Sequence, residues 1–129
     1  ELDAFIVEQV NSLPASNRKL VTSHDNLGYF AERYGFSVIG AIFPTTGPDA
    51  QPSAQAVARL VALIKTSGVK ALFVENTADP KLAQQIAKEA SVKIVASLFT
   101  DSLGESGSAG DSYLKMMRFN VTQIVNALK

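Results

Sequence analysis

The sequence predicts an α/β fold, a three-layer α/β/α sandwich around a four-stranded parallel sheet. Every run of β-forming residues is followed by a segment with helical spacing of apolar residues, an alternation typical of parallel sheets. The strand segments are apolar almost throughout, as expected for strands covered by helices on both faces. Right-handed crossovers and a doubly wound layout then favour the strand order 2-1-3-4.

The first part of the chain is expected to form a helix, a strand and a second helix. Apolar residues at helical spacing continue until Pro14 stops them, and Leu20–Thr22 predicts a short strand. Asp25 is the expected N-terminal cap of the next helix, and Gly35 suits the left-handed position just past its end. The apolar stripes of these two helices are Leu2, Phe5, Ile6 and Val10, and Leu27, Phe30, Ala31 and Tyr34.

The middle of the chain predicts a strand, a long loop and a helix. Phe36–Ile42 has the composition of a strand. Pro44–Ser53 contains three prolines and one glycine in ten residues, so it is expected to be a loop that ends at a Ser53 cap. The helix that follows ends at Gly68. Its inward residues are expected to be Val57, Leu60, Val61 and Ile64.

The last part of the chain completes the sheet. Ala71–Val74 predicts the third strand, and Asp79 is the expected cap of a helix that has Pro80 at its first position and ends near Ala90. Lys93–Phe99 predicts the fourth strand, which is followed by a polar, glycine-rich loop and a long helix. The inward face of that helix is expected to contain Leu114, Met117, Val121, Ile124 and Leu128, with Met116 also packed in the core.

Composition limits the functions that this sequence could serve. The 129 residues suit one domain, and the 12 basic residues balance 12 acidic ones without a basic cluster, so nucleic acid is not an expected partner. The absence of cysteine excludes disulfides and thiolate metal sites. No apolar run approaches the roughly 20 residues of a membrane-spanning helix, and no signal peptide is present. Because Glu1 already lies in a helical pattern, we interpret the chain as a processed or excised piece.

The predicted topology brings three polar residues to one edge of the sheet. His24, Glu75 and Asp101 follow the first, third and fourth strands, and the C-terminal ends of parallel strands share one edge, where open α/β folds bind ligands. With order 2-1-3-4, His24 and Asp101 start roughly 10 Å apart, a gap that two side chains could close around a metal ion. They form only half a site, because two or three donors are too few for a closed one.

Simpler interpretations of the same residues remain open at this point. His24 could be a hydrogen-bonded strand-end residue, Asp101 a turn residue, and Glu75 a partner of loop backbone. Ser23, His24 and Asp25 are adjacent, but neighbouring side chains diverge on an extended strand and do not form a catalytic triad. No strand-to-helix turn carries a phosphate-binding or dinucleotide-binding glycine motif.

Three segments around these residues resemble a known family. They are TSHDNLGYFAERYGF, LFVENTADPKLAQQIAKE and LFTDSLGESGSAGDSYLKMMRFN. In this order and spacing they resemble the C-terminal lobe of the zinc- and manganese-binding solute-binding proteins of ABC transporters, the group that includes the metal-binding adhesin lipoproteins. The resemblance covers nearly the whole chain.

The resemblance implies a role for each part of the chain. Family members hold a metal between two α/β lobes joined by a long helix, so residues 1–13 would be the end of the interlobe helix and residues 14–129 the C-terminal lobe. The metal ligands of this lobe map onto His24 and Asp101, and Glu75 would orient them without binding the ion. The N-terminal lobe, with its two histidine ligands, would be a missing partner. A signal peptide and any lipoprotein anchor would also be missing from this sequence.

The implied function is capture of a metal ion rather than catalysis. A periplasmic protein, or one anchored on the outer face of the cytoplasmic membrane, would bind zinc or manganese and deliver it to the membrane permease of an ABC transporter. Histidine at position 24 favours zinc, because family members with glutamate there tend to bind manganese. This lobe alone is expected to bind no metal tightly. Two alternatives are an α/β enzyme with His24 as general base and a surface-binding or adhesion module without metal.

Overall fold

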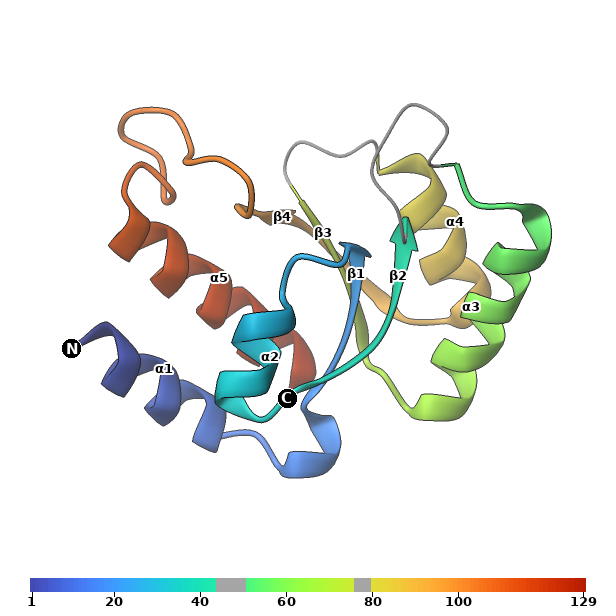
Figure 1. Cartoon of the computed structure of the whole chain (residues 1–129), viewed down its shortest axis with the longest axis horizontal. Helices are drawn as coiled ribbons and strands as arrows, with labels where there is room; N and C mark the ends of the chain where they lie inside the picture. Colours follow the sequence, from blue (N-terminus) through green and yellow to red (C-terminus); the bar gives the residue numbers. More distant parts are fainter. Residues whose placement is uncertain (44–50, 76–79) are drawn as a thin grey trace.

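The computed structural model describes residues 1–43, 51–75 and 80–129, and it confirms the predicted three-layer sandwich (Figure 1). The four strands form one sheet in the order β2-β1-β3-β4, and each paired strand is parallel to its neighbour. The strands are β1 (Lys19–His24), β2 (Ser37–Phe43), β3 (Ala71–Glu75) and β4 (Lys93–Leu98). The predicted topology is therefore correct.

Within the described residues, five helices cover the sheet. They are α1 (Leu2–Asn11), α2 (Gly28–Tyr34), α3 (Ala54–Ser67), α4 (Lys81–Ala90) and α5 (Tyr113–Leu128), and a short 3-10 turn (Ala15–Asn17) connects α1 to β1. Figure 1 shows α1, α2 and α5 on one face of the sheet and α3 and α4 on the other. No helix in the described ranges is both long and apolar enough to cross a membrane.

Alternation of side chains along the strands produces two separate hydrophobic cores. Leu20 and Phe73 point to the face covered by α1, α2 and α5, whereas Val21, Leu72 and Val74 point to the face covered by α3 and α4. All five side chains are 0 or 1% exposed. The central strands β1 and β3 are thus buried on both faces, whereas the edge strands β2 and β4 are largely half-buried or exposed.

The helix ends follow the local sequence in most places. Gly35 and Gly68 adopt left-handed conformations at the C-terminal ends of α2 and α3, with φ of 74° and 73°. The Ser53 hydroxyl accepts a hydrogen bond from the Ala56 N–H and caps α3, as predicted. Pro80 lies immediately before α4 instead of at its first position.

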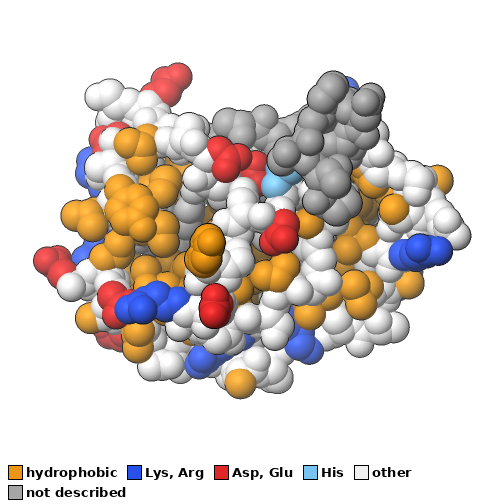
Figure 2. All heavy atoms as spheres, viewed as in Figure 1, with side chains coloured by type: hydrophobic (Ala, Val, Ile, Leu, Met, Phe, Trp, Pro, Cys, Tyr) orange, Lys and Arg blue, Asp and Glu red, His pale blue; other side chains and the backbone are white. Residues whose placement is uncertain are grey.

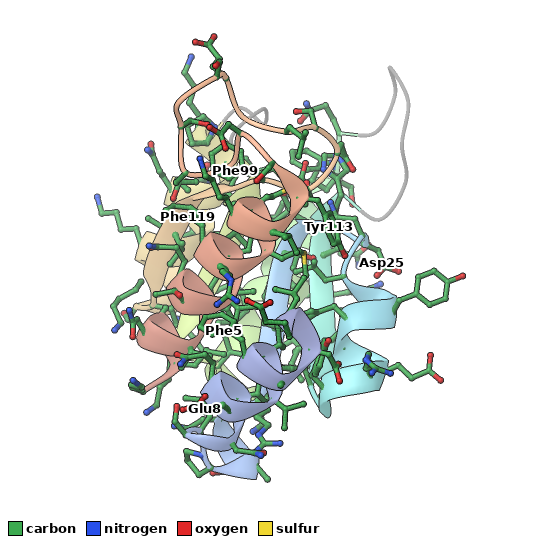
Figure 3. All side chains as sticks on the ribbon, turned by 90° about the vertical axis from the view of Figure 1, so that its left-hand side faces the viewer. Phe5, Glu8, Asp25, Phe99, Tyr113 and Phe119 are labelled. Carbon is green, nitrogen blue, oxygen red and sulfur yellow. The ribbon has the colours of Figure 1, made fainter. Side chains whose placement is uncertain are left out.

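The predicted Asp25 cap is wrong. Helix α2 begins at Gly28, its N-cap residue is Leu27, and no side chain accepts a hydrogen bond there. Asp25 is therefore two residues too early to reach the free amides of the first turn. Figure 3 shows its side chain pointing outward from the connection between β1 and α2.

A second prediction that fails concerns the start of α5. Leu114 was expected on the inward face, but it is 59% exposed, whereas Val121, Ile124 and Leu128 are buried. In Figure 1, α5 starts away from the sheet and approaches it toward its C-terminus, so its first turn has no strand to cover. The predicted Asp79 cap and most of the predicted Pro44–Ser53 loop lie outside the described residues.

Candidate metal centre

His24 is the last residue of β1, at the C-terminal edge of the sheet. Its ring stacks on that of Phe43, its register partner in β2, with centroids 5.3 Å apart and an interplanar angle of 27°. The Thr22 hydroxyl donates a hydrogen bond of 2.6 Å to the His24 carbonyl. The histidine side chain is 31% exposed, and Figure 2 shows acidic side chains near it on the surface. Both its backbone and its ring plane are thus fixed at a position that solvent can reach.

Glu75 ends the neighbouring strand β3, and its buried carboxylate is the centre of a hydrogen-bond network. Only 5% of the side chain is exposed. Oε1 accepts hydrogen bonds from the Ser23 hydroxyl at 3.0 Å and the Asn26 amide at 2.8 Å. Nδ1 of His24 lies 3.2 Å from Oε1 and 3.3 Å from Oε2. A buried carboxylate is costly unless several groups hydrogen-bond it, and here two donors do so while a ring nitrogen of His24 lies within hydrogen-bond distance.

The contact with Glu75 leaves one ring nitrogen of His24 available. Nδ1 faces the carboxylate, and the described part of the chain places no hydrogen-bonding partner on Nε2. Metal-binding histidines commonly have this arrangement, in which one nitrogen contacts a carboxylate and the other binds the ion. Nε2 of His24 is therefore the nitrogen with which this site would bind a metal.

Asp101 leaves the same edge of the sheet, as the third residue after β4, and its side chain is exposed. It forms no cluster with His24 and Glu75. In residues 1–43, 51–75 and 80–129, no three His, Cys, Asp or Glu side chains are grouped so that they could hold a metal ion. The structure therefore brings His24 and Glu75 into contact, while a ligand role for Asp101 stays a prediction.

The loop that carries Asp101 is anchored at its start. The side chain of Asn120, on α5, accepts a hydrogen bond from the Phe99 N–H at 3.0 Å and donates one to the Phe99 carbonyl at 2.6 Å. The Phe99 ring then packs so closely under the loop that a β-carbon at Gly104 or Gly110 would lie 2.8 Å from it. The Phe99 and Phe119 rings pack with centroids 5.5 Å apart. Figure 3 shows the two side chains close together.

A cavity of about 200 Å³ lies next to the site, between α2, the end of β4 and α5. Its lining is mainly apolar, but it includes Asn26 and Thr100. The Thr100 hydroxyl is buried and has no hydrogen-bond partner among the described residues. This unpaired group directly precedes Asp101, the residue that is expected to bind an ion.

Three contributors to the site were not predicted from the sequence. Ser23 and Asn26 hold Glu75, and Asn120 anchors the loop of Asp101. A signal exists for Ser23 and Asn26, because both are polar and lie within two residues of His24 at a strand end. No local signal exists for Asn120, which pairs with a residue 21 positions away.

Comparisons with known proteins identify the family to which the chain belongs. The family described as "Zinc-uptake complex component A periplasmic" (ZnuA) matches residues 1–127. The zinc-binding protein TroA of Treponema pallidum is 35% identical over 133 residues, which cover 99% of this chain and 42% of TroA. The manganese-binding lipoprotein MntA of Halalkalibacterium halodurans is 30% identical over 128 residues, which cover 99% of this chain and 42% of MntA.

Solved structures show the same similarity. The periplasmic zinc binding protein TroA from Treponema pallidum superposes with a TM-score of 0.85 and 33% identity, over 98% of this chain and 47% of that chain. A mutant, Mn-bound periplasmic metal binding protein from Candidatus Liberibacter asiaticus superposes with a TM-score of 0.87 and 25% identity, over 99% of this chain and 47% of that chain. The chain thus spans less than half the length of the relatives it matches.

Proposed function

We propose that this chain, which belongs to the family of the periplasmic zinc-uptake complex component A, is the C-terminal lobe of a metal-capturing protein. Residues 14–129 form the lobe, and residues 1–13 form the end of a helix that leads to a second lobe. His24 and Asp101 supply this lobe's half of the metal ligands, and Glu75 orients His24. The remaining ligands come from the other lobe, which completes the site when the two close on the ion.

The contact between Glu75 and His24 is the observation that carries this proposal. A carboxylate on Nδ1 orients the ring so that Nε2 is the nitrogen presented to the metal. The stack on Phe43 restrains the ring from a second direction. Pre-orientation of a ligand reduces the entropy lost when an ion binds. These contacts suit a residue that must present one nitrogen to a metal ion.

The cargo is a divalent transition metal, with zinc favoured over manganese. Relatives are named for both metals, so the family alone does not choose between them. An imidazole nitrogen binds zinc well, and zinc precedes manganese in affinity for the same ligands. Asp101 adds a carboxylate oxygen, which either metal accepts.

We propose metal capture rather than catalysis for this edge of the sheet. In a Ser-His nucleophile, the hydroxyl and the imidazole are hydrogen-bonded to each other. Here the Ser23 hydroxyl donates to Glu75, and His24 contacts the same carboxylate. Ser23 is therefore held away from the role of a nucleophile activated by His24.

The place of action is outside the cytoplasm, and the partner is the permease of an ABC transporter. Relatives are named as lipoproteins and as substrate-binding components of ABC transporters. In such a system, the binding protein releases its ion to a membrane protein, which carries it inward. The recipient surface on this lobe would lie along the C-terminal edge of the sheet, where the ion is held.

Calorimetric titration with zinc and with manganese, in parallel, tests the proposal. We expect weak binding to this chain, with Kd in roughly the micromolar to millimolar range, because only half the ligands are present. The variants His24→Ala and Asp101→Ala should each abolish it. Asp25→Ala removes an exposed carboxylate next to His24 and should leave it unchanged. Equal zinc binding by His24→Ala and the unchanged chain would refute the site.

A further inference from the structure

We infer that Asn26 is a positioning residue that holds the Glu75 carboxylate so that His24 carries its ring proton on Nδ1. Nε2 is then the unprotonated nitrogen before any ion arrives. This inference deepens the proposed function and rests on it for the role of Nε2 as a ligand. The position of the ring proton is a property of the chain without metal and can be measured separately.

The hydrogen-bond inventory around Glu75 determines where the proton lies. An ionised carboxylate only accepts hydrogen bonds. Nδ1 of His24, at 3.2 and 3.3 Å from the two carboxylate oxygens, makes a hydrogen bond there only if it is the protonated nitrogen. In a neutral imidazole the other nitrogen is then an acceptor. The tautomer of His24 therefore follows from the placement of Glu75.

Asn26 is the residue that most directly fixes that placement. Its amide donates the shortest hydrogen bond to the carboxylate, 2.8 Å to Oε1, compared with 3.0 Å from the Ser23 hydroxyl. A hydroxyl can rotate and pair elsewhere, whereas the planar amide donates in a fixed direction. Asn26 lies between β1 and α2, so it reaches across from the strand of His24 to the end of β3.

The ring and backbone of His24 are already constrained by other contacts. Movement of Glu75 would therefore change which ring nitrogen of His24 carries the proton more than it would change the location of the ring. Stacking on Phe43 holds the ring plane, and the hydrogen bond from Thr22 holds the backbone carbonyl. Without the Asn26 amide, the Glu75 carboxylate would lose one of three donors and gain freedom to turn toward water. The ring would remain in place, and its proton would redistribute toward Nε2.

Nuclear magnetic resonance of the imidazole tests this, because His24 is the only histidine among the 129 residues. The ¹⁵N shifts of the two ring nitrogens and the ¹³C shift of Cδ2 report the ratio of Nδ1–H to Nε2–H in the neutral ring. They would be recorded without metal, under conditions in which the ring is neutral. Two variants are compared, Asn26→Ala and Asn26→Asp, and the second keeps the side-chain shape but replaces the donor by an acceptor. Asp25→Ala is the matched control.

In the unchanged chain and in Asp25→Ala, we expect mainly the Nδ1–H form, the reverse of the preference of free imidazole side chains. Asn26→Ala should lower the ratio of Nδ1–H to Nε2–H at least about threefold, the factor supplied by a hydrogen bond of modest net strength. Asn26→Asp should lower it further, because its carboxylate repels Glu75. The backbone amide spectrum verifies that each variant is folded.

Two results would overturn the inference. One is a majority of the Nε2–H form in the unchanged chain, and the other is an unchanged ratio in both Asn26 variants. Zinc titrations of the same samples separate this inference from the proposed function. If the ratio shifts but the unchanged chain binds no zinc, the inference stands and the proposed function fails. If zinc binds through His24 but the ratio of Nδ1–H to Nε2–H is the same in both Asn26 variants as in the unchanged chain, the inference fails and the proposed function stands.

Discussion

Among single residues, Glu75 is notable because its buried carboxylate depends on hydrogen bonds from its neighbours. Its carboxylate is 5% exposed, and its hydrogen-bonding partners are a hydroxyl, an amide and an imidazole nitrogen, none of which carries a permanent charge. Removing a carboxylate from water costs several kcal/mol, and only a well-formed set of hydrogen bonds offsets that cost. The position therefore couples stability to the orientation of His24.

The variant Glu75→Ala should lower the free energy of unfolding by about 2 kcal/mol, because three donors lose their shared acceptor and a small cavity forms. Urea denaturation measures the change. Glu75→Gln keeps the volume and most hydrogen bonds, so its effect should stay below about 1 kcal/mol. If Glu75→Ala is as stable as the unchanged chain, the hydrogen bonds do not offset the burial of the carboxylate.

Residues at strand ends were the predictable part of the site. His24 and Glu75 could be placed together because each follows a strand and the strands are parallel neighbours. The roles of their immediate neighbours could not be assigned, because Asp25 and Asn26 are both good capping residues on local grounds. The role of Asn26 depends instead on Glu75, which lies 49 positions further along the chain. The Glu75 carboxylate accepts a hydrogen bond from the Asn26 amide.

Among the elements, α5 supports the candidate site from a distance. Asn120, on its inward face, is 6% exposed and pairs with both the N–H and the carbonyl of Phe99. These two bonds continue the edge of β4 after its last residue, Leu98, and direct the chain toward Asp101. The position of a predicted ligand thus depends on a helix that does not contain it.

The variant Asn120→Leu should destabilise the chain by about 2 kcal/mol, because it leaves two partly buried backbone groups of Phe99 without their partners. Hydrogen exchange at the Phe99 amide should accelerate by a larger factor than exchange in the centre of β3. Thr122→Ala, which removes only a hydroxyl bond to the Arg118 carbonyl of the same helix, is the control. Unchanged exchange at Phe99 would contradict the anchoring role.

A charged contact joins α1 to α2 on the surface. Asp3 accepts hydrogen bonds of 2.9 Å from the Tyr34 hydroxyl and from Nε of Arg33. The Tyr34 hydrogen bond and then the Arg33 hydrogen bond hold the pKa of Asp3 below its ordinary value of 3.8. A lowered pKa means that the contact stabilises the fold above about pH 3.8 and is lost as the pH falls through the lowered value.

We therefore expect Asp3→Asn to flatten the acid side of the stability profile. Urea midpoints measured between about pH 5 and pH 2 should fall less steeply in this variant than in the unchanged chain. Glu8→Gln, at an exposed position on the same helix, removes a carboxylate that has no such partners among the described residues and should retain the steeper fall. Parallel profiles for Asp3→Asn and the unchanged chain would show that the contact contributes nothing.

For the molecule as a whole, both hydrophobic cores lie within the described residues. One core joins α1, α2 and α5 to the sheet, and the other joins α3 and α4 to it, through apolar side chains. This global arrangement was predictable, because periodic apolar patterns and the handedness of crossovers leave few topologies. The exposure of Leu114 was not predictable from the sequence, because this residue has the helical spacing of an inward-facing position. Only the position of α5 relative to the sheet leaves it uncovered.

Because the cores are independent of the site, we expect one cooperative thermal transition that a chelator does not shift. Calorimetry with and without a chelator measures this. An excess of zinc should raise Tm only slightly, in keeping with weak binding. A sharp drop in Tm on adding chelator would show that the lobe already holds a complete, tightly bound metal.

The sheet order also determines when the site can exist during folding. β1, α2 and β2 are consecutive in the chain, and so are β3, α4 and β4, so each unit can assemble through short-range contacts. His24 belongs to the first unit and Glu75 to the second, 51 positions away, and the two meet only when β1 pairs with β3. Closing that distance is a slow, long-range step. The contact between His24 and Glu75 therefore forms only after the two halves of the sheet have joined.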